Sequence, residues 1–111
     1  MSGFDEREKA FEQEFLHDRD LHFRIVARRN KLFGLWVAHR IGLWGDAAER
    51  YALSVVDSEI VGRGDEAVVQ RLLRDLANAA VPATEQEVRA QLELFDEKAR
   101  TEIIGKTSYG T

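Results

Sequence analysis

Histidines and carboxylates lie close together near the start of the chain, at spacings that could bind a metal ion. Glu14 and His17 are three residues apart, and Asp18 and His22 are four apart, so each pair would share one face of a helix. Such pairs are also common on charged helices that hold no metal, and the HExxH pattern of zinc enzymes is absent. We therefore predict no metal site.

Gly105, Lys106 and Thr107 look like the end of a phosphate-binding loop. Such a loop also needs a glycine at position 100, where this chain has Arg100, and a preceding strand that the sequence does not predict. No nucleophile with an adjacent base and no pair of carboxylates in an evident cleft emerges from the sequence. The sequence therefore predicts no enzyme, no bound cofactor and a flexible C-terminal tail over residues 105–111.

Length and composition indicate one small intracellular domain. A chain of 111 residues is large enough for a modest core, and the absence of cysteine excludes disulfides and thiolate metal sites. The polar, acidic start does not resemble a signal peptide, and no apolar run approaches the roughly 20 residues that cross a bilayer. We expect a soluble, cytoplasmic protein that does not insert into a membrane.

The net charge of −4 conceals three blocks of opposite sign. Residues 1–23 carry three basic and seven acidic side chains, residues 24–50 six basic and two acidic, and residues 51–111 seven basic and eleven acidic. This segregation favours an oriented contact with a partner, although a solvated helix face would look similar. Arg24, Arg28 and Lys31 could contact phosphates, but an acidic chain without a recognition helix is not expected to bind nucleic acid.

Sparse glycines and a single proline divide the chain into four predicted helices. The first runs from about Asp5 to Ile41, the second from an N-cap at Asp46 to Gly62, the third from Asp65 to Pro82, and the last from the capping box of Thr84 and Glu87. No strand pattern is present. The predicted fold is all-α, a four-helix, bundle-like domain with a long first helix.

Apolar residues predict which side of each later helix faces the core. In the second helix, Tyr51 and Val55 lie along one side, which Ser58 or Glu59 continues. The corresponding residues are Val68, Val69, Leu72, Leu73, Leu76 and Ala80 in the third helix, and Val88, Leu92, Phe95, Ala99 and Ile103 in the fourth.

The apolar stripe of the first helix is interrupted in the middle by Asp18, His22 and Arg29. Burying these charged groups in one core with the aromatic residues would be costly, so the stripe is expected to serve two surfaces. Residues 25–36 are assigned to the bundle core. Phe4, Phe11 and Phe15 are assigned to a protruding or frayed arm that binds another protein, although folding back onto the bundle is an open alternative.

Three segments of the chain resemble one known family. The chain resembles the zeta inhibitor subunit of alphaproteobacterial F-type ATPases in residues 4–12 (FDEREKAFE), 27–32 (ARRNKL) and 34–38 (GLWVA). The similarity continues through Tyr51 and residues 74–76. The resemblance covers nearly the whole chain. It implies a four-helix protein that binds the catalytic head of the ATPase and blocks ATP hydrolysis but not synthesis.

The resemblance also implies the location of the inhibitory element. In the family this element is the N-terminal segment, which inserts as a helix at a catalytic interface between the alpha and beta subunits of the ATPase, near the gamma subunit. The corresponding residues here are Phe4, Arg7, Phe11, Glu12 and Phe15, with Asp18 and Arg19 at the base. Weak binding of adenine nucleotide is also associated with the family, but no motif assigns residues to it.

These observations divide the chain into three parts. Residues 1–20 form the inhibitory N-terminal arm, residues 21–104 the helical bundle domain, and residues 105–111 the tail. We expect a monomer when free, held at the inner membrane only through the ATP synthase. The alternative is a non-catalytic helical adaptor or scaffold that binds a different partner through the same arm.

Overall fold

The structure is a computed structural model that describes residues 2–57 and 63–108, and the side chains of residues 19–57 and 63–105. These residues form helices α1 (Ser2–Arg40), α2 (Gly45–Val56), α4 (Asp65–Asn78) and α5 (Glu85–Ser108). No strand occurs among them. The predicted all-α, bundle-like fold is confirmed.

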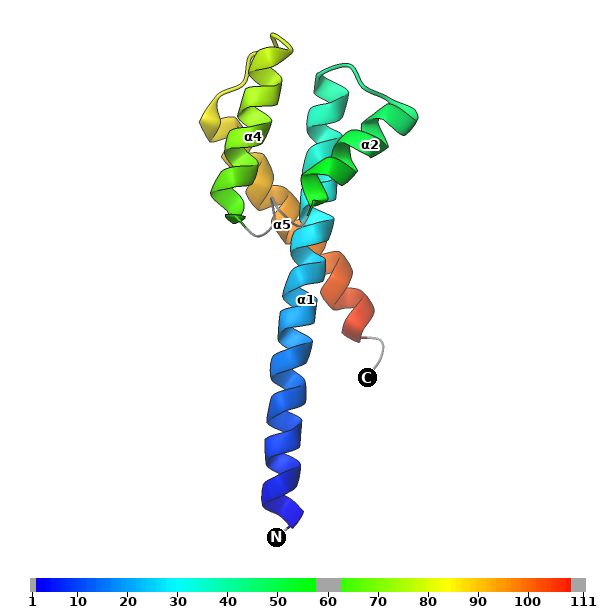
Figure 1. Cartoon of the computed structure of the whole chain (residues 1–111), viewed down its shortest axis with the longest axis vertical. Coiled ribbons are helices and arrows are strands. Elements are labelled where there is room, and N and C mark those ends of the chain that lie inside the picture. The colour runs from blue at the N-terminus through cyan, green and yellow to red at the C-terminus, as the bar shows by residue number, and fades with distance from the viewer. Residues whose placement is uncertain (1, 58–62, 109–111) are drawn as a thin grey trace.

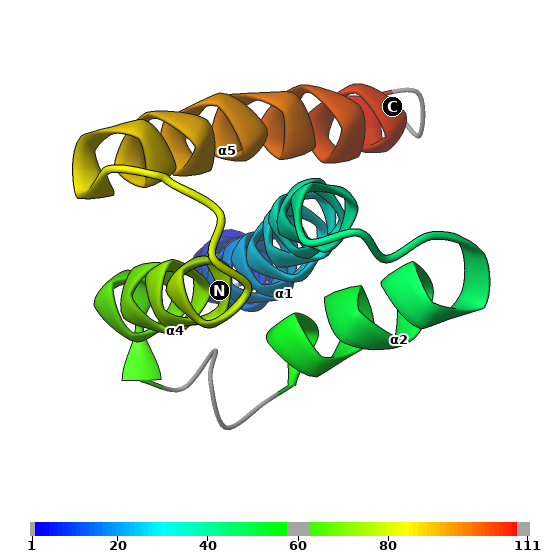
Figure 2. The same ribbon diagram turned by 90° about the horizontal axis from the view of Figure 1, so that it is seen from above.

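The molecule is long and narrow because one helix runs through its whole length. Its dimensions are 65 × 25 × 22 Å, and the 39 residues of α1 at about 1.5 Å each account for most of the longest one. The carboxyl-terminal half of α1 lies between α5 on one side and α2 and α4 on the other (Figure 2). Its amino-terminal half extends away from the other three helices (Figure 1).

The core surrounds the carboxyl-terminal half of α1 and draws on all four helices. Phe33 and Val37 of α1 are fully buried at its centre. The other members are Val55, Val68, Val69, Leu72, Leu76, Val88 and Leu92. Trp36, which the pattern assigned to the core, is only partly buried and packs on the Phe33 ring with 6.1 Å between centroids. Phe95 and Tyr51 also pack against the core from its edge.

Gly34 allows α1 and α2 to pack unusually closely. A Cβ atom at this position would lie 2.8 Å from the Cα of Ala52 and 3.3 Å from its Cβ. Ala48 and Ala52, the residues of α2 one turn apart, are both buried. Gly34 is therefore the contact point of this helix pair.

The start of α2 differs from the prediction. The helix begins at Gly45, and Trp44 rather than Asp46 occupies the N-cap position, without a side-chain capping hydrogen bond. Asp46 lies in the first turn, where a carboxylate is favoured by the helix dipole. Val55 is buried as predicted, whereas Ser58 and Glu59 lie outside the described residues.

Helix α4 ends earlier than its apolar pattern suggested. It stops at Asn78, and Ala80 is exposed with a φ of 58°, so it does not belong to the core. The amide of Val81 donates to the carbonyl of Leu76 at 2.9 Å, which closes the helix in a Schellman-type turn. Pro82 disfavours helix at the preceding residue, and the turn accommodates this restriction.

The predicted cap of α5 is present. The backbone amide of Glu87 donates to Oγ1 of Thr84 at 3.1 Å, which is the N-cap half of the predicted capping box. Val88, Leu92 and Ala99 are buried, and Phe95 and Ile103 are partly buried. The helix continues to Ser108, three residues beyond Gly105, where the sequence predicted that the tail begins.

Polar contacts link α2 to α4 beside the core. The Tyr51 hydroxyl donates to Oδ2 of Asp75 at 2.5 Å, and Arg71 donates to the Ser54 carbonyl at 2.9 Å and to its hydroxyl at 2.7 Å. Burial, together with the hydrogen bond to Asp75, raises the pKa of Tyr51 well above its usual range. The buried tyrosine therefore keeps its proton in the folded protein.

Candidate partner-binding site

The residues expected to bind a partner lie on one uninterrupted helix. Positions 4, 7, 11, 12, 15, 18 and 19 all belong to α1, in the part that extends beyond the bundle (Figure 1). At about 100° per residue, positions 4, 11, 15 and 18 fall within about 60° of one another around the helix axis. The side chains of Phe4, Arg7, Phe11, Glu12, Phe15 and Asp18 lie outside those that the structure describes. Arg19 is exposed.

The arm meets the bundle between residues 19 and 25. The side chains from Arg19 to Arg24 are exposed, apart from the partly buried Leu21, and burial begins at Ile25. Asp20 and Arg24 form an exposed ion pair of 3.1 Å along the helix. Phe23 is exposed here as well. Among the described side chains of α1 the first buried residue is therefore Ile25, and the division of arm from bundle after residue 20 stays a prediction.

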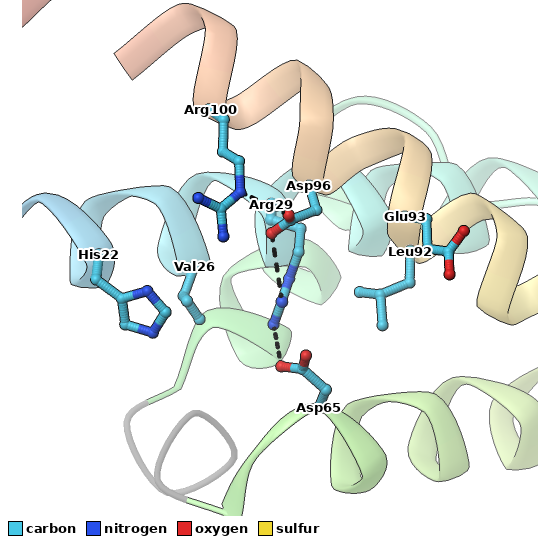
Figure 3. A pocket seen from close by; sticks show the side chains of 8 residues that line it. All are labelled: His22, Val26, Arg29, Asp65, Leu92, Glu93, Asp96 and Arg100. Atoms are coloured by element: carbon cyan, nitrogen blue, oxygen red, sulfur yellow. Dashed lines mark hydrogen bonds and ion pairs between the residues drawn. The ribbon is translucent and has the colours of Figure 1, made fainter. Parts of the chain in front are cut away.

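A buried arginine lies just inside this boundary. The Arg29 side chain is only 5 % exposed, and its Nη2 lies 2.9 Å from Oδ1 of Asp65, the first residue of α4. Its Nη1 lies 3.7 Å from Oδ1 of Asp96 on α5. One residue of α1 is thus paired with carboxylates from two other helices (Figure 3). We call Arg29, Asp65 and Asp96 the Arg29 cluster.

Two further side chains complete the surroundings of Arg29. The neighbouring Asn30 is fully buried, and its Oδ1 accepts hydrogen bonds from Nε and Nη2 of Arg29 at 3.1 and 3.0 Å. Its Nδ2 is buried without a hydrogen-bond partner among the described residues. Arg100 donates to the second carboxylate oxygen of Asp96 at 2.8 Å. The guanidinium of Arg29 is therefore compensated by hydrogen bonds and by charge.

The Arg29 cluster corrects one interpretation of the sequence. The charged residues Asp18, His22 and Arg29 were expected to stay out of the core because an unpaired buried charge is costly. His22 is exposed, but Arg29 is buried, since Asp65 and Asp96 supply the missing charges. Both carboxylates come from helices far along the chain, so periodicity within the first helix gave no sign of them.

A pocket of about 330 Å³ opens beside the cluster, between α1, α4 and α5 (Figure 3). His22 and Val26 line it from α1, and Glu93, Asp96 and Arg100 line it from α5. Acidic and basic groups alternate around it, and the guanidinium of Arg29 is already paired. The pocket thus provides no row of unpaired donors for a phosphate.

The charge pattern of residues 24–50 is largely balanced within the folded chain. Arg28 pairs with Glu102 of α5 at 2.8 Å, and Lys31 pairs with Glu49 of α2 at 3.4 Å. Arg24 and Arg29 also pair with carboxylates. Arg28, Arg29 and Lys31 therefore join α1 to the other helices, whereas the pair of Arg24 and Asp20 lies within α1. The expectation that the chain does not bind nucleic acid stays a prediction.

Neither a metal-binding cluster nor a membrane-spanning helix is found among the described residues. No group of three or more His, Asp or Glu side chains in this part of the chain is arranged to hold a metal ion. His17 lies outside the described side chains, so the expectation of no metal site stays a prediction. No described helix is both long and apolar enough to span a bilayer.

Comparison with known proteins identifies one family. The family model described as ATPase inhibitor subunit zeta matches residues 1–102. The match includes the arm, the Arg29 cluster and most of α5. No curated protein matches the chain.

Proposed function

The chain belongs to the ATPase inhibitor subunit zeta family, and from this premise we propose that it binds the catalytic head of the F-type ATPase and inhibits ATP hydrolysis through residues 1–20. The family is regulatory rather than catalytic by its name. The proposed contacts are made with the alpha, beta and gamma subunits, by Phe4, Arg7, Phe11, Glu12, Phe15, Asp18 and Arg19. The protein would then work at the inner membrane without entering it.

The observation that carries the proposal is the projection of α1 from the bundle. The helix is continuous from Ser2 to Arg40, and among the side chains described in α1, those of residues 19–40, the first buried one is Ile25. A helix with one end anchored in a folded domain and the other end extended can enter a groove on a partner. Because the arm continues a helix that is anchored in the bundle, its conformation and direction are set before it binds. Less conformational entropy is therefore lost on binding than with a flexible peptide.

The proposed inhibition needs no covalent chemistry. Hydrolysis requires the interfaces between catalytic subunits to open and close in sequence, and a helix held in one interface would oppose that cycle. The roughly 28 Å that 19 helical residues span would allow deep insertion while the bundle stays outside. The phenylalanines would supply apolar contact area, and the acidic residues between them would direct the approach.

Binding and inhibition should be measured together on the purified catalytic head of the cognate ATPase. We expect full-length protein to bind the head and to lower its rate of ATP hydrolysis with the same concentration dependence. Binding without a change in hydrolysis would contradict inhibition through the arm. The absence of binding would contradict the proposed function and would favour the alternative of an adaptor whose arm binds a different partner.

A further inference from the structure

We propose that Asp65 is a positioning residue for the N-terminal arm, acting through Arg29 at the point where α1 leaves the bundle. This proposal rests on the proposed function only for its effect on inhibition. Its structural part concerns the Arg29 cluster alone. Asp65 lies in the primary sequence far from the arm and outside the seven residues proposed to contact the ATPase.

The first argument is the burial of Arg29. A guanidinium that is 5 % exposed needs nearby negative charge, because an unpaired buried cation is strongly unfavourable. Of its two carboxylate partners, Asp65 is the closer, at 2.9 Å against 3.7 Å for Asp96, and Asp96 is shared with Arg100. Loss of Asp65 would therefore favour movement of the Arg29 side chain toward solvent.

The second argument is the place of the cluster in the molecule. Arg29 lies one turn from Ile25, the first buried residue among the described side chains of α1. The pocket beside Arg29 is lined by His22 and Val26 from the two preceding turns (Figure 3). Helix α4 begins with Asp65 at the end of the bundle that faces the arm (Figure 1). Displacing Arg29 would loosen the packing of residues 25–29. The stably packed part of α1 would then begin later, and the arm would be held less firmly.

The neighbouring Glu66 provides a matched control. It also lies in the first turn of α4, carries the same charge and pairs with an arginine of another helix. That arginine is Arg89 of α5, at 2.8 Å, so Glu66 joins α4 to α5 and leaves α1 untouched. Removal of either carboxylate costs α4 one ion pair and one favourable charge at its N-terminus. Of the two carboxylates, only Asp65 forms an ion pair with a residue of α1.

The test compares Asp65→Ala with Glu66→Ala in two measurements. The first is the concentration needed for half-inhibition of ATP hydrolysis by the catalytic head. The second is hydrogen exchange of the backbone amides of α1 in the free protein, over residues 19–28 and over residues 33–38. Asp65→Asn, which keeps a hydrogen-bond acceptor, and Asp65→Glu, which keeps the charge, serve as conservative variants.

We expect Asp65→Ala to raise the half-inhibitory concentration by about tenfold and to speed exchange at residues 19–28 by a similar factor. Exchange at residues 33–38 should not change, and Glu66→Ala should behave as the unmodified chain in both measurements. Asp65→Glu should stay close to the unmodified chain in both the half-inhibitory concentration and the exchange rate at residues 19–28. Asp65→Asn should lie closer to Asp65→Ala in both.

Equal behaviour of Asp65→Ala and Glu66→Ala would overturn the proposal, since both variants would then report only the loss of an ion pair on α4. Unchanged exchange at residues 19–28 in Asp65→Ala would overturn it as well. If the unmodified chain does not inhibit hydrolysis, the proposed function fails, and hydrogen exchange alone decides whether Asp65 holds the base of the arm.

Discussion

Gly34 of α1 and Ala52 of α2 approach so closely that a Cβ atom added to the glycine would lie 2.8 Å from the Cα of the alanine. Backbone atoms cannot move aside as a flexible side chain can. Cγ2 of the buried Val55 would lie 3.2 Å from the same Cβ atom. The spacing of α1 and α2 thus depends on the absence of one side chain.

We expect Gly34→Ala to destabilise the protein by about 1 to 3 kcal/mol, the usual cost of overpacking a core contact. This loss should occur although alanine favours a helix by about 1 kcal/mol over glycine. Urea denaturation measures the difference. Gly105→Ala in α5 is the control, because nothing lies within 4 Å of its added Cβ, and it should be neutral or stabilising. A Gly34→Ala variant as stable as Gly105→Ala would contradict the close approach.

The hydrogen bond from Tyr51 to Asp75 predicts a loss of stability at alkaline pH. Burial and the Asp75 contact raise the pKa of Tyr51 in the folded protein, whereas in the unfolded chain it returns to its ordinary value of 10.0. The stabilising contribution is therefore fully present below pH 10 and falls as pH rises from there toward the folded pKa.

Tyr51→Phe removes this titration. We expect the variant to lose about 1 kcal/mol at neutral pH, the value of one hydrogen bond, because Asp75 keeps its ion pair with Arg71. Between about pH 9 and pH 11 the free energy of unfolding should fall less steeply in the variant than in the unmodified chain. Parallel pH profiles for the two proteins would contradict the raised pKa.

The aromatic residues Phe33 and Trp36, in the carboxyl-terminal part of α1, should differ in their contribution to stability. Phe33 is fully buried, so Phe33→Ala should cost about 3 to 5 kcal/mol. Trp36→Ala should cost less, because Trp36 is only partly buried and one face of its ring carries the exposed Arg40, 4.5 Å from the ring centroid. Thermal and urea unfolding of both variants measure the two losses of stability. A larger loss in Trp36→Ala than in Phe33→Ala would contradict the position of Phe33 at the centre of the core.

Periodicity and turn residues were sufficient to predict the helices. The stripes of α4 and α5 identified most of their buried residues, and the cap at Thr84 marked the start of α5 because its hydrogen bond is local. The errors at helix ends also have local causes. Helix α2 starts at Gly45, one residue before the expected cap at Asp46, and the turn before Pro82 removes Ala80 from α4.

The Arg29 cluster could not be predicted in the same way. A charged residue in an apolar stripe has two interpretations, a boundary of the core or a buried ion with distant partners, and the stripe alone cannot separate them. Asp65 and Asp96 lie on other helices, and their relation to Arg29 depends on how those helices pack. The same limit applies to Gly34, whose role is defined by Ala52.

Phe11 and Phe15 are expected to act on the partner and not on the fold. Phe11→Ala and Phe15→Ala should each weaken inhibition by about 10-fold or more, as truncation of an aromatic contact residue does at an interface. Their melting temperatures should match that of the unmodified chain. A sharp fall in melting temperature would instead support the alternative that these residues fold back onto the bundle.

ATP hydrolysis by the cognate catalytic head, measured with the full-length chain, with a chain lacking residues 1–19 and with buffer alone, tests the central claim most directly. The truncated chain retains every residue of α1 that is buried among the described side chains, so its fold can be verified by circular dichroism and by its melting temperature. We predict that the full-length chain lowers the hydrolysis rate and that the truncated chain gives the rate seen with buffer. Equal inhibition by the full-length and truncated chains would contradict the assignment of inhibition to the arm.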